Sequence, residues 1–225
     1  GLAVSPDGTK AYVANRLSGT VSVINTTTNA VDATVTVGTQ PWGLAVSPDG
    51  TKAYVANRLS DTVSVINTTT NAVDTTVTVG TRPRGVAVSP DGTKAYVTND
   101  DSNNVSVINT TTNAVDATIT VGDAPWGVAF SPNGTKAYVG NHDSGTVSII
   151  TTSTNTVDAT ITLGTDPGGV AVSPDGTTAY VADFTSGVVR VVDLRATASA
   201  SASASADPGV PGIFLAVNDV LVGSQ

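Results

Sequence analysis

Apolar and polar positions follow one another along this chain in short stretches that recur with a period of 42 residues. In the first copy, apolar residues fill most of 1–4, 11–14 and 21–24, whereas residues 31–37 alternate between apolar and polar. Short stretches rich in Val, Ile and Thr predict β-strands, and a helix would need a longer pattern with a period near 3.6. Each copy therefore predicts four short strands.

Turn signals separate these stretches. The Ser-Pro-Asp-Gly sequence at 5–8 predicts a hairpin between the first two strands, and the Asn-Thr-Thr-Thr-Asn sequence at 25–29 predicts a turn before the fourth. The first strand is apolar on both faces, as expected at a crowded centre, and the alternating fourth strand is expected at an outer edge. Five copies open at Gly1, Gly43, Gly85, Gly127 and Gly169.

Four-stranded units repeated around a centre are the blades of a β-propeller. We predict an all-β, five-bladed propeller of antiparallel blades over residues 1–195, closed into a ring because an open arc would expose two apolar faces. One tyrosine recurs in each second strand, and we expect it to pack between neighbouring blades. These residues are Tyr12, Tyr54, Tyr96, Tyr138 and Tyr180.

The fifth copy lacks its own outer strand. An Ala/Ser-rich, then Pro/Gly-containing linker takes its place at 196–212, and an apolar segment follows at 213–225. This segment could return to blade five, complete a sheet of an adjacent subunit, or begin a further domain. We favour strand addition in trans, which predicts a homo-oligomer or polymer. The residues of this assembly strand are Ile213, Phe214, Leu215, Val217, Val220, Leu221 and Val222.

The second strands carry a resemblance to a known family. Tyr-Val-Ala-Asn at 12–15 and 54–57 and Tyr-Val-Gly-Asn at 138–141, each after a Ser-Pro-Asp/Asn-Gly turn, resemble the YVTN family of β-propeller repeats. The resemblance covers residues 1 to about 194. It implies extracytoplasmic proteins, notably those of surface layers, and no established reaction. Related propellers include lactonases and quinoprotein subunits.

Composition excludes several classes of function. The net charge is −8 and the ten basic residues are spread along the chain, so nucleic acid and anionic membranes are not expected partners. No apolar run is long enough for a membrane helix. Cysteine is absent, which excludes disulfides and thiolate chemistry, and the absence of methionine indicates a processed product or a fragment. The abundance of Thr, Ser, Asn and Gly, with no Glu, favours an extracellular or cell-surface location.

Sequence differences between the copies gather in two loops of each blade, which share one end of a propeller. Loops that vary on a constant scaffold are where a ligand or partner is expected to bind, although unconstrained drift would give the same pattern. The candidate residues on this face are Arg16, Trp42, Arg58, Arg82, Arg84, Asp100, Asp101, Trp126, His142, Asp143 and Phe184.

Taken singly, these residues give weak signals of chemistry. His142 is the only histidine and precedes Asp143, but no nucleophile motif accompanies the pair, so we expect no catalytic residues. One histidine without Cys or Glu cannot build a typical zinc site. Asp100 and Asp101 could bind Ca²⁺ but match no known calcium pattern. We therefore expect no metal and no cofactor.

Aromatic and basic residues of the same face allow binding. Trp42 and Trp126 could stack on sugar rings, although covering blade junctions is the simpler interpretation. Arg58, Arg82 and Arg84 could receive a carboxylate or a sulfate. Asparagines in the Asn-x-Ser/Thr pattern would be glycosylation sites in a suitable host. They are Asn25, Asn67, Asn104, Asn109 and Asn133.

These features lead to one preferred function and two alternatives. Repetition, the tethered strand and the lack of a convergent acid–base set favour a non-enzymatic structural or adhesion module of a surface layer or filament. The first alternative is a propeller that binds surface glycans or another small ligand, and the second is a lactonase-like hydrolase.

Overall fold

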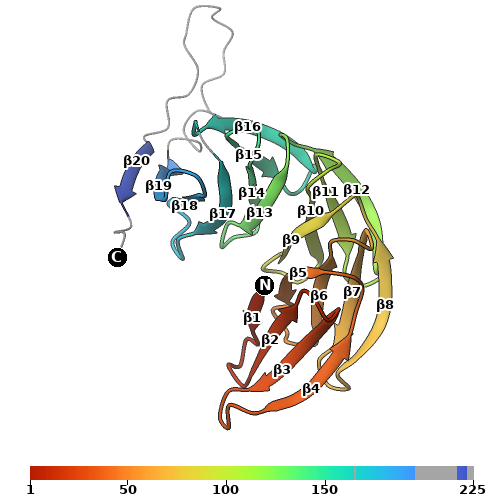
Figure 1. Ribbon diagram of the computed structural model, residues 1–225. Coiled ribbons are helices and arrows are strands. Elements are labelled where there is room, and N and C mark those ends of the chain that lie inside the picture. The colour runs from red at the N-terminus through yellow and green to blue at the C-terminus, as the bar shows by residue number, and fades with distance from the viewer. Residues whose placement is uncertain (165, 196–216, 222–225) are drawn as a thin grey trace, which may run out of the picture.

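The computed structural model describes residues 1–164, 166–195 and 217–221 and shows an all-β molecule built from five antiparallel four-stranded sheets, blades 1 to 5 (Figure 1). The predicted fold class is confirmed. Strands follow chain order from the inner to the outer edge of each blade. Blade 1 contains β1 (Leu2–Val4), β2 (Lys10–Asn15), β3 (Thr20–Asn25) and β4 (Val31–Thr36); blade 2 contains β5 (Pro41–Val46), β6 (Lys52–Asn57), β7 (Thr62–Asn67) and β8 (Ala72–Thr78).

Blades 3 to 5 repeat this order. Blade 3 contains β9 (Pro83–Val88), β10 (Lys94–Asn99), β11 (Asn104–Asn109) and β12 (Ala114–Thr120). Blade 4 contains β13 (Pro125–Phe130), β14 (Lys136–Asn141), β15 (Thr146–Thr151) and β16 (Thr156–Thr162). Blade 5 contains β17 (Pro167–Val172), β18 (Thr178–Asp183), β19 (Val188–Asp193) and β20 (Val217–Leu221). Among the residues described, no helix has the length and hydropathy needed to cross a membrane.

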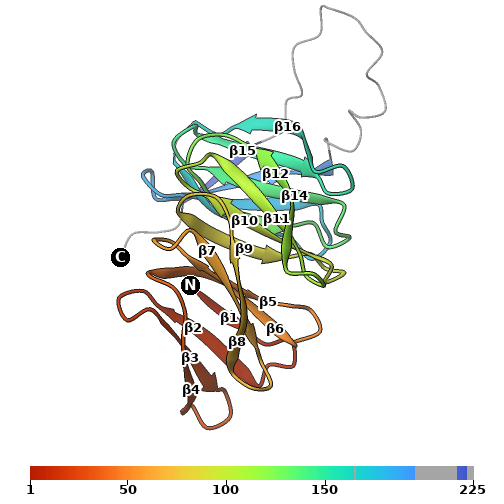
Figure 2. The ribbon, with the colours of Figure 1, turned by 90° about the vertical axis from the view of Figure 1, so that its right-hand side faces the viewer.

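The core lies between blades rather than within them. Tyr12, Val21 and Val23 of blade 1 pack against Leu44 and Val55 of blade 2, and similar clusters fill the next three junctions. Each cluster buries the tyrosine of the earlier blade, as expected from the sequence. Successive blades stack through these contacts, and Figure 2 shows them from the side, from blade 1 at the bottom to blades 4 and 5 at the top.

The glycines that open repeats 1 to 4 have a packing reason, whereas a Cβ atom on Gly169 of repeat 5 would meet nothing within 4 Å. A Cβ atom on Gly43 would lie 2.2 Å from the carbonyl oxygen of Arg84, and one on Gly85 would lie 2.2 Å from that of Trp126. Both contacts are far below van der Waals separation, so only glycine lets the inner strands of adjacent blades approach this closely. In repeats 1 to 4, the 42-residue glycine period therefore reflects the close spacing of adjacent inner strands.

The blades form an open arc, so the predicted closed ring is wrong. In Figure 1, blade 1 and blade 5 are separated by a wide opening. Leu2 and Val4 of blade 1 are 63% and 50% exposed, and Tyr180 of blade 5 is 45% exposed, although the equivalent tyrosines in blades 1 to 4 are buried. The angle between blades is set by the side chains that fill each junction, and four such steps do not complete a circle.

Blade 5 is completed by the chain itself. Strand β20 pairs antiparallel with β19, with Val188 opposite Leu221 and Val192 opposite Val217. The expectation that this strand is added in trans is therefore wrong, and the return to its own blade is the alternative that the structure supports. Pairing within the chain fills the free edge of β19, so no neighbouring subunit is needed to cover it. Ile213, Phe214, Leu215 and Val222 lie outside the described residues, as does the linker at 196–212.

Candidate functional site

A β-bulge places the first row of site residues. Pro41 lies opposite Asn57 and Leu44 lies opposite Val55, so the inner strand of blade 2 carries one residue more than its partner, between positions 41 and 44. The same shift occurs at the start of the inner strands of blades 3, 4 and 5. Bulges redirect side chains relative to a regular strand. The residue after the proline is Trp42, Arg84, Trp126 and Gly168 in blades 2 to 5.

The second row follows the second strand of every blade. Arg16, Arg58, Asp100, His142 and Phe184 each come directly after the last residue of that strand. Backbone hydrogen bonds tie this row to the residue just before each inner-strand proline: the N–H of Asp100 donates to the carbonyl of Arg82 at 3.0 Å, and the N–H of His142 donates to that of Ala124 at 2.9 Å. Both rows therefore lie at the same end of the arc, as the loop pattern predicts.

Cations and aromatic rings of the two rows alternate across the blades, and we call this array the Arg–Trp ladder: Arg16, Trp42, Arg84, Trp126 and His142. The guanidinium carbons of Arg16 and Arg84 both lie 4.9 Å from the Trp42 ring centroid. The carbon of Arg84 also lies 3.2 Å from the Trp126 centroid. Arg84 therefore contacts both indoles.

Trp126 is covered on both faces. The imidazole of His142 stacks on it with centroids 3.6 Å apart and an interplanar angle of 17°. Two groups this close to one ring centre cannot share a face, so Arg84 and His142 lie on opposite faces of the indole. Phe184 meets Trp126 edge-on at 5.7 Å. No face of Trp126 is left for a sugar ring.

Asp100 is the carboxylate of this array. Its Oδ2 lies 3.2 Å from Nη2 of Arg58 and 3.5 Å from Nη1 of Arg84. Its Oδ1 accepts a 3.2 Å hydrogen bond from Nε1 of Trp126. The Asp100 side chain is 10% exposed. The negative charge of Asp100 therefore faces two guanidiniums. The guanidinium of Arg16 has no ion pair within the described part of the chain.

Burial and charge both act on Arg84. Burial lowers the pKa of its guanidinium to about 10, Asp100 opposes this effect, and the positive charges of Arg58 and Arg16 add to it. The group still carries its charge at neutral pH. A half-buried cation of this kind is a strong partner for an anion, because water screens it poorly.

His142 is held in one orientation. Its Nδ1 lies 2.7 Å from Oδ1 of Asp143. Because an ionised carboxylate only accepts hydrogen bonds, we infer that Nδ1 carries the proton of the neutral ring and that Nε2 bears the lone pair. Nε2 is buried and has no hydrogen-bond partner among the described residues. An Nε2 atom in this state has a free lone pair that can accept a hydrogen bond.

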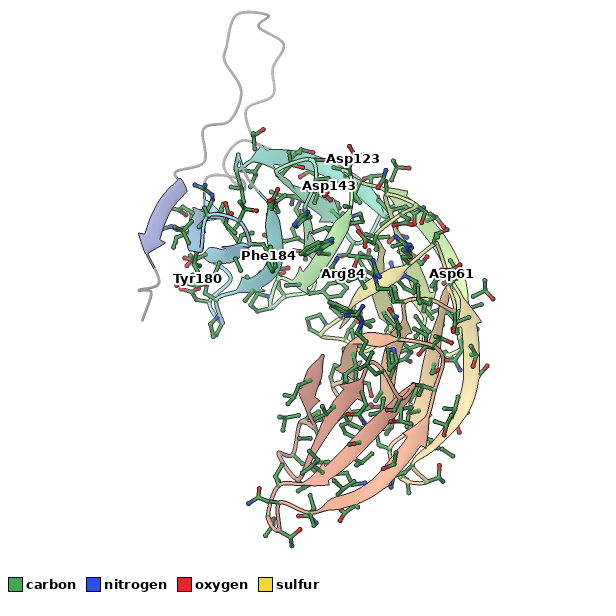
Figure 3. All side chains as sticks on the ribbon, in the orientation of Figure 1. Asp61, Arg84, Asp123, Asp143, Tyr180 and Phe184 are labelled. Atoms are coloured by element: carbon green, nitrogen blue, oxygen red, sulfur yellow. The ribbon has the colours of Figure 1, made fainter. Side chains whose placement is uncertain are left out.

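The remaining predicted residues lie apart from the ladder. Arg82 and Asp101 form an ion pair at 3.2 Å in which both side chains are more than 40% exposed. Asp101 and Asp143 line an open cavity of about 460 Å³ together with Asp100 and Asp123. In the part of the chain that is described, no three His, Cys, Asp or Glu side chains gather as metal ligands. Figure 3 marks Arg84 and Phe184 toward the inner side of the arc and Asp61 toward its outside.

The predicted glycosylation sites have structural hydrogen bonds. The Oδ1 atoms of Asn25, Asn67 and Asn109 each accept two backbone N–H groups of the following turn. Asn104 bonds to Ser102 and Asn99, and Asn133 caps the turn of blade 4. These bonds give each asparagine a structural role, and glycosylation of these residues stays a prediction.

Comparison with known proteins places the chain in a family. It belongs to the lactonase family of seven-bladed β-propellers, whose model matches residues 2–118, more than half of the sequence. No curated protein matches it. The match confirms the predicted resemblance to a family of β-propellers, and the finer resemblance to surface-layer YVTN repeats stays a prediction.

Two solved structures share the fold. Hydrazine synthase of Kuenenia stuttgartiensis is 22% identical with a TM-score of 0.72, over 91% of this chain and 79% of that one. A functionally unknown protein of Desulfotomaculum acetoxidans is 21% identical with a TM-score of 0.77, over 85% of this chain and 64% of that one. The chain thus spans less than two thirds of the second protein.

The preferred function from the sequence is therefore corrected. A structural or adhesion module that assembles through its C-terminal strand is wrong, because the family is one of lactonases and β20 completes its own blade. The lactonase-like alternative fits these findings better.

Proposed function

We propose that this propeller belongs to a hydrolase that opens small lactones bearing an anionic group, and that the Arg–Trp ladder carries both the anion-binding residues and the base. The observation on which the proposal depends is the state of His142, whose Nδ1 is held by Asp143 while its buried Nε2 is unpartnered among the described residues. The lactonase family match supports the same class of reaction.

Charge distribution supports an anionic substrate. The chain has a net charge of −8, yet four of its six arginines lie on this face. Three of them, Arg16, Arg58 and Arg84, surround Trp42 at 4.9 to 5.9 Å. Nε of Arg58 is buried without a hydrogen-bond partner in the described residues. Guanidiniums with spare donors are suited to bind a carboxylate or phosphate.

The reaction follows from these groups. A water molecule attacks the lactone carbonyl while Nε2 of His142 takes its proton. The guanidiniums of the ladder lie on the other side of Trp126 from His142, and we assign them to the anionic substituent of the substrate rather than to the reacting carbonyl. The ring C–O bond then breaks, and the leaving alkoxide takes the proton from His142. The product is a hydroxy acid, which releases one proton to solvent when its carboxyl group ionises.

A panel of γ- and δ-lactones tests this proposal. Each ring size is supplied with and without a carboxylate substituent, and hydrolysis is followed by proton release in weak buffer. We expect saturable, protein-dependent hydrolysis of the carboxylated members at a lower KM than that of their neutral counterparts. Hydrolysis no faster than with heat-unfolded protein across the panel overturns the proposal, and equal KM values overturn the assignment of an anionic substrate.

A further inference from the structure

One carboxylate connects three blades at the ladder. Asp100 comes from blade 3 and contacts Arg58 of blade 2, Arg84 of blade 3 and Trp126 of blade 4. At the same repeat position the other blades carry Arg16, Arg58, His142 and Phe184. A negative charge occurs here once, at the middle of the five blades.

Each contact of Asp100 fixes a different group. Oδ2 holds Arg58 and Arg84 together, although two like charges would otherwise separate. Oδ1 fixes the rotation of the Trp126 indole through Nε1. Because Arg84 lies on one face of Trp126 and His142 on the other, these bonds set the relative positions of a guanidinium and the base.

We propose that Asp100 is a positioning residue that keeps Arg84 against Trp126 and thereby fixes both the anion-binding guanidinium and the ring on which His142 stacks. This inference rests on the proposed function for its consequence in catalysis. Its structural part concerns the Arg84–Trp126 contact and is independent of any substrate.

Asp100 could have a simpler role, the compensation of positive charge, and the two roles predict opposite effects of neutralising Asp100 on the binding of anions. If Asp100 only offsets positive charge, its neutralisation leaves the guanidiniums in place with a stronger field and tightens the binding of anions. If Asp100 positions the guanidiniums, the same change lets them separate and weakens binding. The sign of the change in KM therefore distinguishes the two roles.

Asp100→Asn is the decisive variant, because an amide oxygen can still accept the Trp126 hydrogen bond while the charge that holds both arginines is lost. Asp100→Glu keeps the charge and is expected to restore part of the wild-type behaviour. Asp101→Asn is the matched control, since Asp101 is the adjacent residue, is exposed, and forms its one ion pair among the described residues with Arg82, which lies outside the ladder.

The first measurement needs no substrate. In a Trp42→Phe background, Trp126 is the only tryptophan, and its emission and acrylamide quenching report on its covered faces. We expect Asp100→Asn to shift the emission to longer wavelength and raise the quenching constant, Asp100→Glu to do so less, and Asp101→Asn not at all. An unchanged spectrum in Asp100→Asn, with unchanged far-UV circular dichroism, overturns the positioning role.

The second measurement uses the lactone that the wild type hydrolyses best. We expect Asp100→Asn to lower kcat/KM on the order of 100-fold with a raised KM, because small displacements of positioned groups are costly. A lowered KM supports charge balance instead and overturns the inference. If no lactone is hydrolysed, the proposed function fails, and the tryptophan spectra alone decide whether Asp100 positions Arg84.

Discussion

The guanidinium carbon of Arg84 lies 3.2 Å from the ring centroid of Trp126, on the face opposite His142. Arg84 comes from the bulge of β9 and Trp126 from the equivalent bulge of β13, one blade further along the arc. The contact therefore crosses a blade junction. It links the arginines around Trp42 to the histidine that we assign as the base.

Arg84→Lys tests the planar contact. Lysine keeps the charge but has no flat group to stack between two indoles and no fork for a carboxylate. An ammonium still makes a cation–π contact, so the loss is that of the stacked and forked geometry, and we expect the KM for an anionic lactone to rise by about ten-fold. Arg82→Lys, an exposed neighbour, is the control and should leave KM unchanged. Equal effects of the two substitutions would contradict the ladder.

Tyr54→Phe and Tyr96→Phe form a matched pair at successive blade junctions. Burial raises the pKa of both hydroxyls to about 12. The Tyr96 hydroxyl donates to Oδ1 of Asn155 at 2.8 Å, whereas that of Tyr54 has no partner among the described residues. We expect Tyr96→Phe to lower the free energy of unfolding by about 1 kcal/mol and Tyr54→Phe to leave it equal or higher. Urea unfolding measures both, and the reverse order would contradict the assigned hydrogen bonds.

Acid stability depends on the repeated turns. A hydrogen bond from the serine two residues earlier is the largest cause that lowers the pKa of each turn aspartate, to about 2 for Asp175. A carboxyl group whose pKa is lower in the folded state stabilises the fold above its unfolded pKa of about 3.9, and this contribution is lost as the pH falls toward 2.

Asparagine at these turns should weaken that dependence. Blade 4 already carries Asn133, which accepts the same bonds from Ser131 and Thr135 and does not titrate. We expect the free energy of unfolding of the fourfold variant to fall less between pH 4 and pH 2 than that of the wild type. An identical slope would show that these turns do not govern acid stability. The substitutions are Asp7→Asn, Asp49→Asn, Asp91→Asn and Asp175→Asn.

Tyr138→Ala and Tyr180→Ala test the open arc. Tyr138 is 4% exposed at the junction of blades 4 and 5, and Tyr180 is 45% exposed at the free face of blade 5 (Figure 3). Loss of a buried aromatic side chain costs about 3–5 kcal/mol, so Tyr138→Ala should be strongly destabilising and Tyr180→Ala only mildly so. Equal losses in thermal unfolding would mean that the end face is covered in solution.

The sequence predicts the blades well and their closure poorly. The 42-residue period, the turns and the alternation in the outer strands are local signals, and each corresponds to an element of the structure. Closure depends on the angle between blades, which arises from packing between residues about 42 positions apart. The pairing of β20 with β19 likewise depends on what covers a distant edge. Neither property leaves a local pattern.

The candidate site, like the fold, is predicted in part by the sequence. Variation between the repeats places Trp42, Arg84, Trp126 and His142 on one face, but it does not predict which of them contact one another. Their positions depend on the bulge after each inner-strand proline, because the extra residue redirects the side chains relative to a regular strand. The recurring Pro-x-Gly at the start of these strands is the signal that could have indicated the bulge.

The most direct test of the account is the rate of lactone hydrolysis by wild type and by His142→Ala under saturating substrate. Asn133→Ala, in an exposed turn at the opposite end of blade 4, serves as the control. General-base catalysis contributes roughly 100-fold to 10,000-fold, so we predict a loss of that size in kcat for His142→Ala and none for Asn133→Ala. A His142→Ala protein that folds normally and hydrolyses the lactone at the wild-type rate would contradict the assignment of this face as the site of a hydrolase.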